Sequence, residues 1–264
     1  MNDSPPERLI FGQVADVYQR SRPGYPLEAV RWLTGLGRAR VLELGAGTGK
    51  LTAPLVELGH QVVATDPSSE MLQQLRAAVP AATTIQAAAE RIPLASSSVD
   101  VVAAGTAFHW FDPDTAVPEI ARVLRPEGVV SLVWNFRDES VPWVRRLTSI
   151  MGPESLQKDP SDALASTGLF APAEHRTFRF WQRIDRPSLI GLVESRSYVA
   201  IMPADERAEL LGRVGELYDE YGRGHDGMLL PYTTECFRAR VTGLANYRRE
   251  YPEPPTEGLL IDFN

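Results

Sequence analysis

The chain has 264 residues, of which 44% are hydrophobic and 23% are charged, a composition typical of a globular protein with a sizeable core. Its formal net charge is -7 at pH 7. Because nucleic acids attract proteins through basic surfaces, this acidic balance argues against DNA or RNA as the main partner. The length suits one large domain, or one domain with a substantial insertion.

The location of the protein is indicated by weak signals that agree with one another. Cys236 is the single cysteine, so no internal disulfide can form and a reducing compartment is expected. The first residues lack the cationic start and apolar core of a secretory signal. No apolar run approaches the length of a membrane span. These features predict a cytoplasmic protein that does not cross a membrane.

From residue 40 to residue 135 the sequence alternates short apolar runs with segments of helical spacing. The runs are apolar at nearly every position, which is typical of parallel strands covered on both faces. The pattern therefore predicts a doubly wound α/β fold whose ligand binds at the carboxyl ends of the strands. We expect strands at 41–44, 61–65, 83–86, 99–104 and 128–134, and helices at 50–58, 68–76 and 113–124.

After residue 135 the alternation gives way to longer helical segments. Helices are expected at 141–151, 163–169, 188–195 and 204–221, with strands at 174–181 and 232–239. No internal repeat or low-complexity linker is visible, so one domain over residues 1–250 with a helical elaboration is the simplest arrangement. The proline-rich end, 251–264, is expected to be a surface tail.

The stretch RVLELGAGTGK, residues 40–50, places three glycines on alternate positions after the first strand. A Walker loop needs a glycine where Leu44 stands and a Ser or Thr where Leu51 stands, so that interpretation fails. A dinucleotide fingerprint would need a glycine where Lys50 stands. This departure weakens the dinucleotide interpretation but leaves it open.

Four stretches together resemble the class I S-adenosylmethionine (SAM)-dependent methyltransferases. They are 43–49 (ELGAGTG), 66–72 (DPSSEML), 89–94 (AERIPL) and 124–128 (LRPEG), and they follow the spacing of the small-molecule branch of that family. The segment 11–26 is also similar to trans-aconitate methyltransferase-like and ubiquinone/menaquinone-biosynthesis-type members. The resemblance covers roughly residues 8–135 and implies a Rossmann-like, mostly parallel seven-stranded sheet, with 1–135 binding SAM and the late strands and helices of 136–250 selecting the acceptor.

The resemblance implies SAM as the cofactor and a set of residues that hold it. Glycines allow close backbone approach to the methionine part of SAM, Glu43 would lie near its ammonium group, and Asp66 would accept both ribose hydroxyls. An N-cap role for Asp66 and a plain core role for Met71 are the alternatives. Ala88 stands where many relatives carry an Asp that contacts the adenine amine. The implied cofactor-binding residues are Tyr18, Arg22, Glu43, Gly45, Ala46, Gly47, Gly49, Asp66, Pro67, Met71, Ala89, Glu90, Thr106 and Ala107.

The stretch that follows the fourth strand, 105–112 (GTAFHWFD), should face the transferable methyl group. His109 is the candidate catalytic base, since imidazole can accept a proton near neutral pH. In the alternative, the aromatic residues anchor the loop and His109 makes a structural hydrogen bond. The expected acceptor-binding residues are Tyr25, His109, Trp110, Trp134 and Tyr198. The histidines do not stand at metal-ligand spacing, so no metal is expected.

Together these patterns predict a SAM-dependent methyltransferase that methylates a small-molecule acceptor by in-line displacement. Orientation and desolvation can provide much of the acceleration, so a general base is needed only for a protonated acceptor. A non-catalytic SAM- or nucleotide-binding module and a nicotinamide-dependent reductase of Rossmann type are the alternatives. No membrane or nucleic-acid partner is expected.

Overall fold

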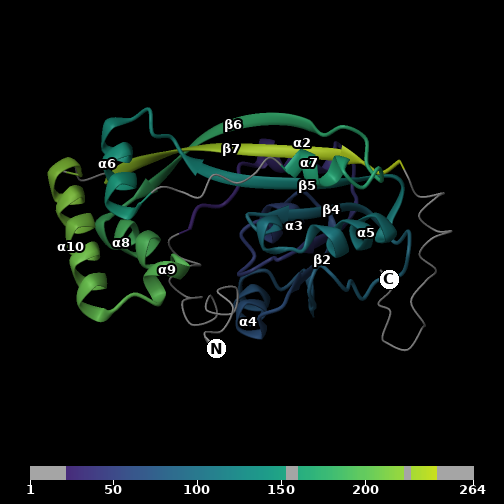
Figure 1. The fold of residues 1–264 in the computed structure, drawn as a ribbon, viewed down its shortest axis with the longest axis horizontal. Helices are drawn as coiled ribbons and strands as arrows, with labels where there is room; N and C mark the ends of the chain where they lie inside the picture. The colour runs from purple at the N-terminus through teal and green to yellow at the C-terminus, as the bar shows by residue number, and fades with distance from the viewer. Residues whose placement is uncertain (1–21, 153–159, 223–226, 243–264) are drawn as a thin grey trace. The chain divides into compact units, whose positions relative to one another are not determined.

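The computed structural model describes residues 22–152, 160–222 and 227–242 (Figure 1). Within these residues seven strands form one sheet in the order β3-β2-β1-β4-β5-β7-β6. The expected tail 251–264 lies outside the described residues. The strands are β1 (Arg40–Leu44), β2 (Gln61–Asp66), β3 (Thr83–Gln86), β4 (Val99–Gly105), β5 (Leu124–Arg137), β6 (Glu174–Ile184) and β7 (Met228–Arg240).

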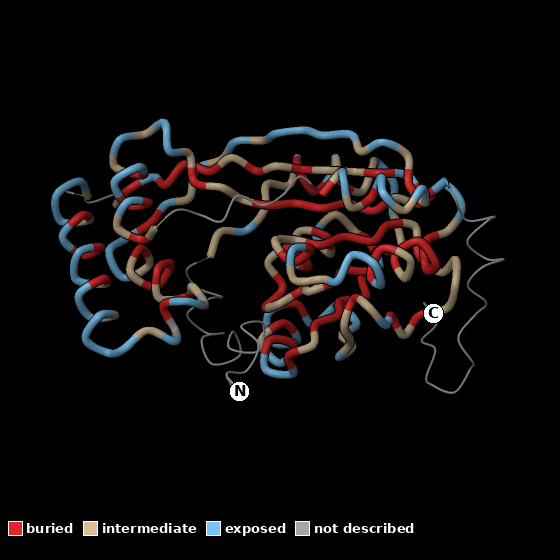
Figure 2. Tube along the Cα trace, in the orientation of Figure 1, coloured by how far each residue is buried: buried red, intermediate tan, exposed pale blue. Residues whose placement is uncertain are grey.

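The first five strands are parallel and mostly buried. β1 pairs with β2 and β4, β2 pairs with β3, and β4 pairs with β5. Figure 2 shows β1, β4 and β5 as largely buried tubes, as strands covered on both faces should be. Their carboxyl ends share one edge of the sheet, so the fold class predicted from the sequence is confirmed.

The last two strands complete the sheet in a different way. The amide of Asp138 donates to the carbonyl of Pro231, and the amide of Val241 donates to the carbonyl of Gly128. The first bond joins the end of β5 to the start of β7, and the second joins the end of β7 to the start of β5, so β5 and β7 are antiparallel. β6 lies at the edge, and its side chains alternate between exposed and partly buried. The sheet is thus mostly parallel, as expected.

Helices flank the strands along the described chain. They are α2 (Leu27–Thr34), α3 (Thr52–Glu57), α4 (Ser69–Ala78), α5 (Pro113–Val123), α6 (Pro142–Met151), α7 (Pro160–Ala165), α8 (Arg186–Glu194), α9 (Ser197–Ala200) and α10 (Ala204–Tyr221). A short 3-10 turn, η2, spans Phe108–Trp110. The sequence did not predict α2, and the expected helix over 163–169 was wrong in its second half. That helix ends at Ala165, and Gly168 adopts a φ of 65°, which stops helical continuation.

The chain divides into two compact units. Of the described residues, the larger unit comprises 25–134, 160–178 and 235–242, and the smaller unit comprises 22–24, 135–152, 179–222 and 227–234. In the larger unit a buried cluster links α2 and α3 to strands β1, β2, β4 and β5, with Val41, Leu55 and Val101 among its members. The parallel sheet and its carboxyl edge therefore belong to one packed body. The expected single domain over 1–250 stays a prediction.

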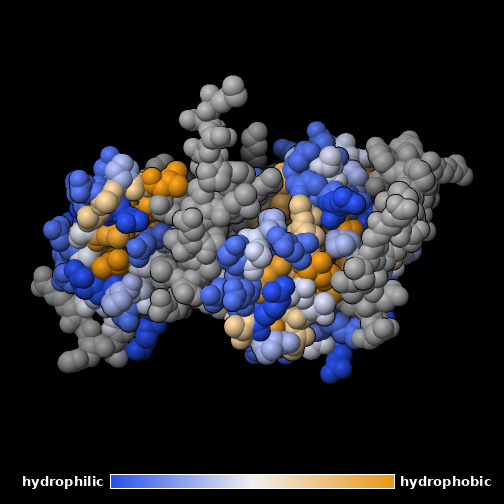
Figure 3. Space-filling view, turned by 90° about the horizontal axis from the view of Figure 1, so that it is seen from below, coloured by the Kyte–Doolittle hydropathy of each residue, from blue (hydrophilic) through white to orange (hydrophobic). Residues whose placement is uncertain are grey.

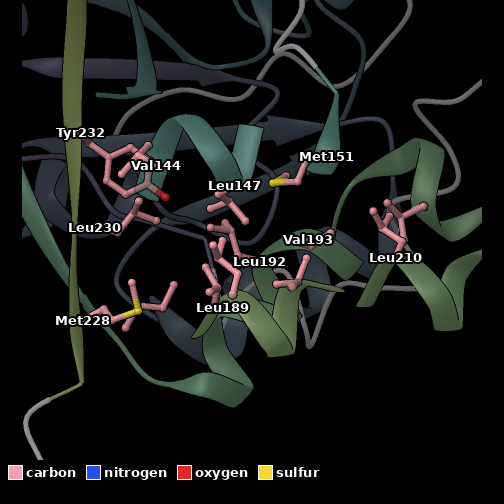
Figure 4. Packing of buried hydrophobic residues seen from close by; sticks show 14 residues of the cluster. Val144, Leu147, Met151, Leu189, Leu192, Val193, Leu210, Met228, Leu230 and Tyr232 are labelled. Atoms are coloured by element: carbon pink, nitrogen blue, oxygen red, sulfur yellow. The ribbon is translucent and has the colours of Figure 1, made fainter. Parts of the chain in front are cut away.

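The smaller unit has a hydrophobic cluster of its own. Figure 4 shows Val144 and Leu147 of α6 gathered with Leu189 and Leu192 of α8, beside Leu230 of β7. These side chains are at most 1% exposed. The apolar faces of the late helices thus cover one another and the strand residues of this unit, which include the first residues of β7.

On the face that Figure 3 shows, apolar residues form small groups among hydrophilic ones. The large apolar side chains that are exposed are Leu36, Trp181, Tyr198, Ile201, Tyr221 and Leu229. No helix in the described residues is long and apolar enough to cross a membrane.

Two leucines of the smaller unit offer a matched test of its core. Leu147 is 0% exposed and Leu229 is 54% exposed. Leu147→Ala should lower the free energy of unfolding by about 2–5 kcal/mol, because it removes buried methyl groups and leaves a cavity. Leu229→Ala should change it by less than about 0.5 kcal/mol. Urea denaturation checks both, and equal losses would contradict the assigned core.

Candidate active site

Asp66 joins the two turns that follow β1 and β2. Its Oδ2 accepts the amide of Gly47 at 2.9 Å, and its Oδ1 accepts the amide of Ser68 at 2.9 Å. The N-cap of α4 is Ser68, whose Oγ accepts the amide of Met71, so the N-cap alternative for Asp66 was wrong. Burial raises the pKa of Asp66, and the two amide hydrogen bonds oppose this rise. The carboxylate is therefore fixed in place at the carboxyl edge of the sheet, and its oxygens keep further lone pairs for a ligand.

The glycine loop is shaped by three positive φ angles, 62° at Gly45, 55° at Gly47 and 92° at Gly49. A Cβ on Gly45 would lie 2.6 Å from the Cβ of Ala107, so the loop touches the segment that follows β4. A Cβ on Gly47 would meet nothing within 4 Å. Only glycine combines these angles with such close approach. The loop is thus closed at Gly45 and open at Gly47.

Thr48, inside this loop, is 1% exposed, and its hydroxyl has no hydrogen-bond partner among the described residues. A buried hydroxyl without a partner is costly, so a ligand that bonds to it would remove that cost. The open space at Gly47, the Thr48 hydroxyl and the Asp66 carboxylate lie within 20 residues of sequence. This donor and acceptor set fits a ligand with a ribose and a polar amino-acid part.

Glu43 lies in β1 and is 1% exposed. The hydroxyl of Thr52 donates to its Oε2 at 2.6 Å. Burial raises the pKa of Glu43 to about 8; the Thr52 hydrogen bond opposes this effect, and the nearby Asp66 adds to it. The carboxyl is therefore poised to change charge near neutral pH. A cationic group beside it would favour the carboxylate form.

Thr106 occupies an unusual backbone position directly after β4. Its φ is 52°, which is strained for a β-branched residue. The Oγ of Thr106 and the hydroxyl of Tyr25 lie 3.0 Å apart, and the Thr106 amide donates to the carbonyl of Val133 at 2.7 Å. A Cβ on Gly105 would lie 2.8 Å from the Tyr25 hydroxyl. Such strain of about 1–3 kcal/mol persists where surrounding contacts hold it, and it clusters at functional sites.

The η2 turn carries the aromatic residues of the 105–112 stretch. Phe108 is buried and meets Phe111 edge-on at 5.7 Å, which anchors the turn. His109 is exposed, and its ring centroid lies 4.9 Å from that of Trp110. The structural hydrogen bond considered for His109 does not occur among the described residues. Desolvation by its surroundings lowers the pKa of His109 to about 4, so its imidazole is neutral at physiological pH.

The segment after β3 lies against the same edge. The amide of Ala87 donates to the backbone carbonyl of Asp66 at 3.2 Å. Glu90 accepts the amide of Asp112 at 3.0 Å, and Ala89 is buried. One oxygen of Glu90 is therefore already engaged at the start of α5. Pro67 accepts a hydrogen bond from Gln86 through its carbonyl, and Met71 is 4% exposed, as a core residue would be.

The other predicted residues are placed as follows. Trp134 is buried and meets Phe237 edge-on at 5.9 Å. Arg22 and Tyr198 belong to the smaller unit, where Arg22 donates to the Ser195 hydroxyl at 3.0 Å and Tyr198 donates to the Met151 carbonyl at 2.8 Å. Their roles toward cofactor and acceptor stay predictions. Tyr18 lies outside the described residues.

The sequence analysis missed several residues that shape the site. The hydroxyl of Thr52 donates to Glu43, and the amide of Ser68 donates to Asp66 in the turn after β2. Thr48 offers a hydroxyl that has no partner among the described residues. A Ser before a run of helical spacing was a visible capping signal. Nothing in the local sequence marks the partners of Glu43. In the described ranges no group of three or more His, Cys, Asp or Glu could hold a metal ion.

Comparisons with known proteins agree with this site. Residues 42–132 match the family described as "Methyltransferase domain". The chain is 45% identical over 236 residues to an "Uncharacterized methyltransferase" of Mycobacterium tuberculosis, covering 88% of this chain and 96% of that protein.

Solved structures add the fold. A proposed type II methyltransferase from Anaeromyxobacter dehalogenans is 26% identical, with a TM-score of 0.58, and the match covers 83% of this chain and 97% of that one. A phosphoethanolamine N-methyltransferase of Haemonchus contortus, solved with S-adenosylhomocysteine, has a TM-score of 0.55 at 16% identity, covering 91% of this chain and 61% of that one. Membership of the methyltransferase family gives SAM as the cofactor, and the binding-module and reductase alternatives are not favoured.

The raised pKa of Glu43 predicts pH-dependent cofactor affinity. If the carboxylate meets the ammonium group of SAM, binding must ionise Glu43, so affinity should rise as pH increases from 6 toward 8. The gain should be roughly 10-fold or more in the native protein. Calorimetric titration with SAM at pH 6, 7 and 8 measures it.

Glu43→Gln is the matched control, because it keeps the shape and removes the titration. Both proteins share any pH effect that arises in SAM itself, so the difference between their slopes isolates Glu43. Equal slopes would contradict the assignment.

The same raised pKa predicts how the ligand-free protein responds to pH. The free energy of unfolding should fall as pH rises between 4.5 and about 8, and this loss should vanish in Glu43→Gln.

Proposed function

The chain belongs to the class I SAM-dependent methyltransferases, and from this premise we propose that it methylates a small-molecule acceptor by in-line displacement. The observation that carries the proposal is the link from Gly47 through Asp66 to Ser68, which fixes two ligand-facing turns at one edge of the sheet. SAM, when bound, supplies an activated methyl group on a sulfonium. Residues of this chain would bind the cofactor, orient the acceptor and exclude water.

The cofactor-holding roles follow from what each group offers. Asp66 would accept the ribose hydroxyls with its remaining lone pairs, and the buried Glu43 would stabilise the ammonium group. The open backbone at Gly47 and the hydroxyl of Thr48 would line the methionine part. Because the carboxylates of Asp66 and Glu43 are already held by protein hydrogen bonds, they lose little entropy when the ligand arrives.

The segment after β4 is proposed to face the acceptor. Tyr25 holds Thr106 in its strained conformation, and the adjoining turn presents His109 and Trp110. A neutral imidazole can accept a proton at its unprotonated nitrogen from an acceptor hydroxyl or amine. Trp110 offers a flat aromatic wall that excludes water and favours a nearby cation. Trp134 and Tyr198 remain proposed acceptor contacts.

A small acceptor is favoured over a nucleic acid by the net charge of -7. The Mycobacterium tuberculosis relative carries no acceptor in its name, so the atom that receives the methyl group must be found by experiment. We also propose a cytoplasmic location, on the ground that Cys236 has no second cysteine to pair with. The thiol is buried and its pKa is raised to about 12, which makes it unreactive.

The test of the function is a search for the acceptor. The protein is incubated with methyl-labelled SAM and a fractionated metabolite extract, and the labelled product is identified by mass. Asp66→Ala serves as the binding-deficient control, and Asp219→Ala, an exposed carboxylate paired with Arg186, serves as the matched neutral change. Label that enters small molecules only with the native and Asp219→Ala proteins supports the proposal. Label found only on protein or nucleic acid would refute it.

His109→Ala tests the proton-accepting role once the acceptor is known. If His109 accepts a proton, turnover should fall by roughly 100-fold while SAM affinity holds. Since the neutral imidazole is the active form and its pKa is about 4, native turnover should persist at pH 6 and decline only as pH falls toward 4. Native turnover in a folded His109→Ala protein would leave orientation as the source of acceleration.

A further inference from the structure

A buried ion pair on α5 lies against the segment that follows β3. Arg122 is 6% exposed and Glu119 is 19% exposed in its side chain. Nε of Arg122 donates to Oε1 of Glu119 at 2.6 Å, and its Nη2 donates to Oε2 at 2.8 Å. This bidentate pair is a geometry that only arginine can make.

The pair holds the backbone of the segment rather than its side chains. Nη1 of Arg122 donates to the carbonyl of Leu94 at 2.8 Å, and Nη2 donates to the carbonyl of Ile92 at 2.8 Å. Glu119 Oε2 accepts the amide of Ile92 at 2.9 Å. Three hydrogen bonds thus tie the backbone of Ile92 and Leu94 to side chains of α5 that lie almost thirty positions later in the sequence. The segment cannot shift without breaking several charge-assisted bonds.

The other end of the segment is bonded to the ribose-binding residue. The amide of Ala87 donates to the backbone carbonyl of Asp66, and Glu90 accepts the amide of Asp112 at the start of α5. Because the Ala87 amide bonds to the backbone of Asp66, the start of this segment is adjacent to the residue that we propose binds the ribose. Ala88 provides no carboxylate for the exocyclic amine of adenine, and Glu90 is engaged elsewhere. The amide of Arg91 donates to the carbonyl of Ala88 at 3.2 Å, which adds a turn within the segment and leaves its other backbone groups to recognise the base.

We propose that Arg122 and Glu119 are positioning residues that fix the backbone of residues 87–94 so that it discriminates adenine by its exocyclic amine. The inference rests on the proposed cofactor site. Recognition by backbone requires the chain to be held within a few tenths of an ångström, because a carbonyl cannot reorient as a side chain can. A buried ion pair contributes little to net stability compared with apolar residues, so its value here is positional.

The test compares two ligands that differ only on one edge of the base. S-Adenosylhomocysteine carries adenine, with an amine at C6 and an unprotonated N1, and S-inosylhomocysteine carries hypoxanthine, with a carbonyl at C6 and a protonated N1. The native protein should bind the adenine ligand roughly 10- to 100-fold more tightly, because the hypoxanthine carbonyl would face a backbone carbonyl. Calorimetric titration gives both dissociation constants.

Arg122→Gln should lower affinity for S-adenosylhomocysteine by about 10-fold and change affinity for S-inosylhomocysteine by less than about 2-fold. The ratio of the two affinities should therefore fall by about 10-fold, from 10–100 to roughly 1–10. Arg122→Lys keeps the charge and can reach one carbonyl, so it should restore part of the ratio. Arg125→Gln is the matched control, since Arg125 pairs with Asp100 and does not contact the segment. Its ratio should match that of the native protein.

The outcomes separate the inference from the proposed function. If the native protein binds neither ligand, the proposed function fails and this inference fails with it. If the native protein binds both ligands equally, only the inference fails. If Arg122→Gln melts at the native temperature and weakens both ligands by the same factor, the pair is merely structural and the inference is overturned. If Arg122→Gln does not fold, the same comparison of ratios is made with Arg122→Lys.

Discussion

The carboxylate of Asp66 is the constraint on which the rest of the site depends. It accepts amides from the turn after β1 and from the turn after β2, so the two carboxyl ends keep one relative geometry. The backbone of the same residue accepts the amide of Ala87. Three segments far apart in sequence thus meet at one residue. A site built in this way is organised before any ligand binds, which lowers the entropy lost on binding.

Strain in the neighbouring loop depends on this fixed edge. Gly45 adopts its positive φ at no steric cost because it has no Cβ, and the same absence lets Ala107 pack closely against it. Thr106 follows β4 with a φ of 52°, and the Tyr25 hydroxyl and the Val133 carbonyl hold it there. A loop pressed between two rigid elements can keep a conformation that would relax in isolation. The result is a turn whose aromatic side chains have a defined direction.

The parts of this structure that sequence predicted are those set by local pattern. Alternating apolar runs predicted the parallel sheet, and the sequence placed Gly45, Gly47 and Asp66 after its strands, where the structure brings Gly47 and Asp66 into contact; their role toward the cofactor stays a prediction. The contacts that could not be predicted are non-local. Whether Glu43 would find a hydrogen-bond donor, or Arg122 two carbonyls, depends on how α3 and α5 pack, and one sequence does not contain that information. The helix expected at 163–169 failed because a glycine with positive φ outweighs helical spacing.

Buried charge is the feature that links stability to function here. Glu43 and the Arg122–Glu119 pair lie in or near the core, where apolar residues of similar volume would often be at least as stabilising. Each of these groups makes specific hydrogen bonds: Glu43 accepts one from the Thr52 hydroxyl, and Arg122 donates to the carbonyls of Leu94 and Ile92. A hydrophobic replacement could fill the same space but could not hold a backbone oxygen at 2.8 Å. These buried charges therefore add little to the free energy of folding, and the desolvation that they require is offset by the fixed backbone geometry that they provide.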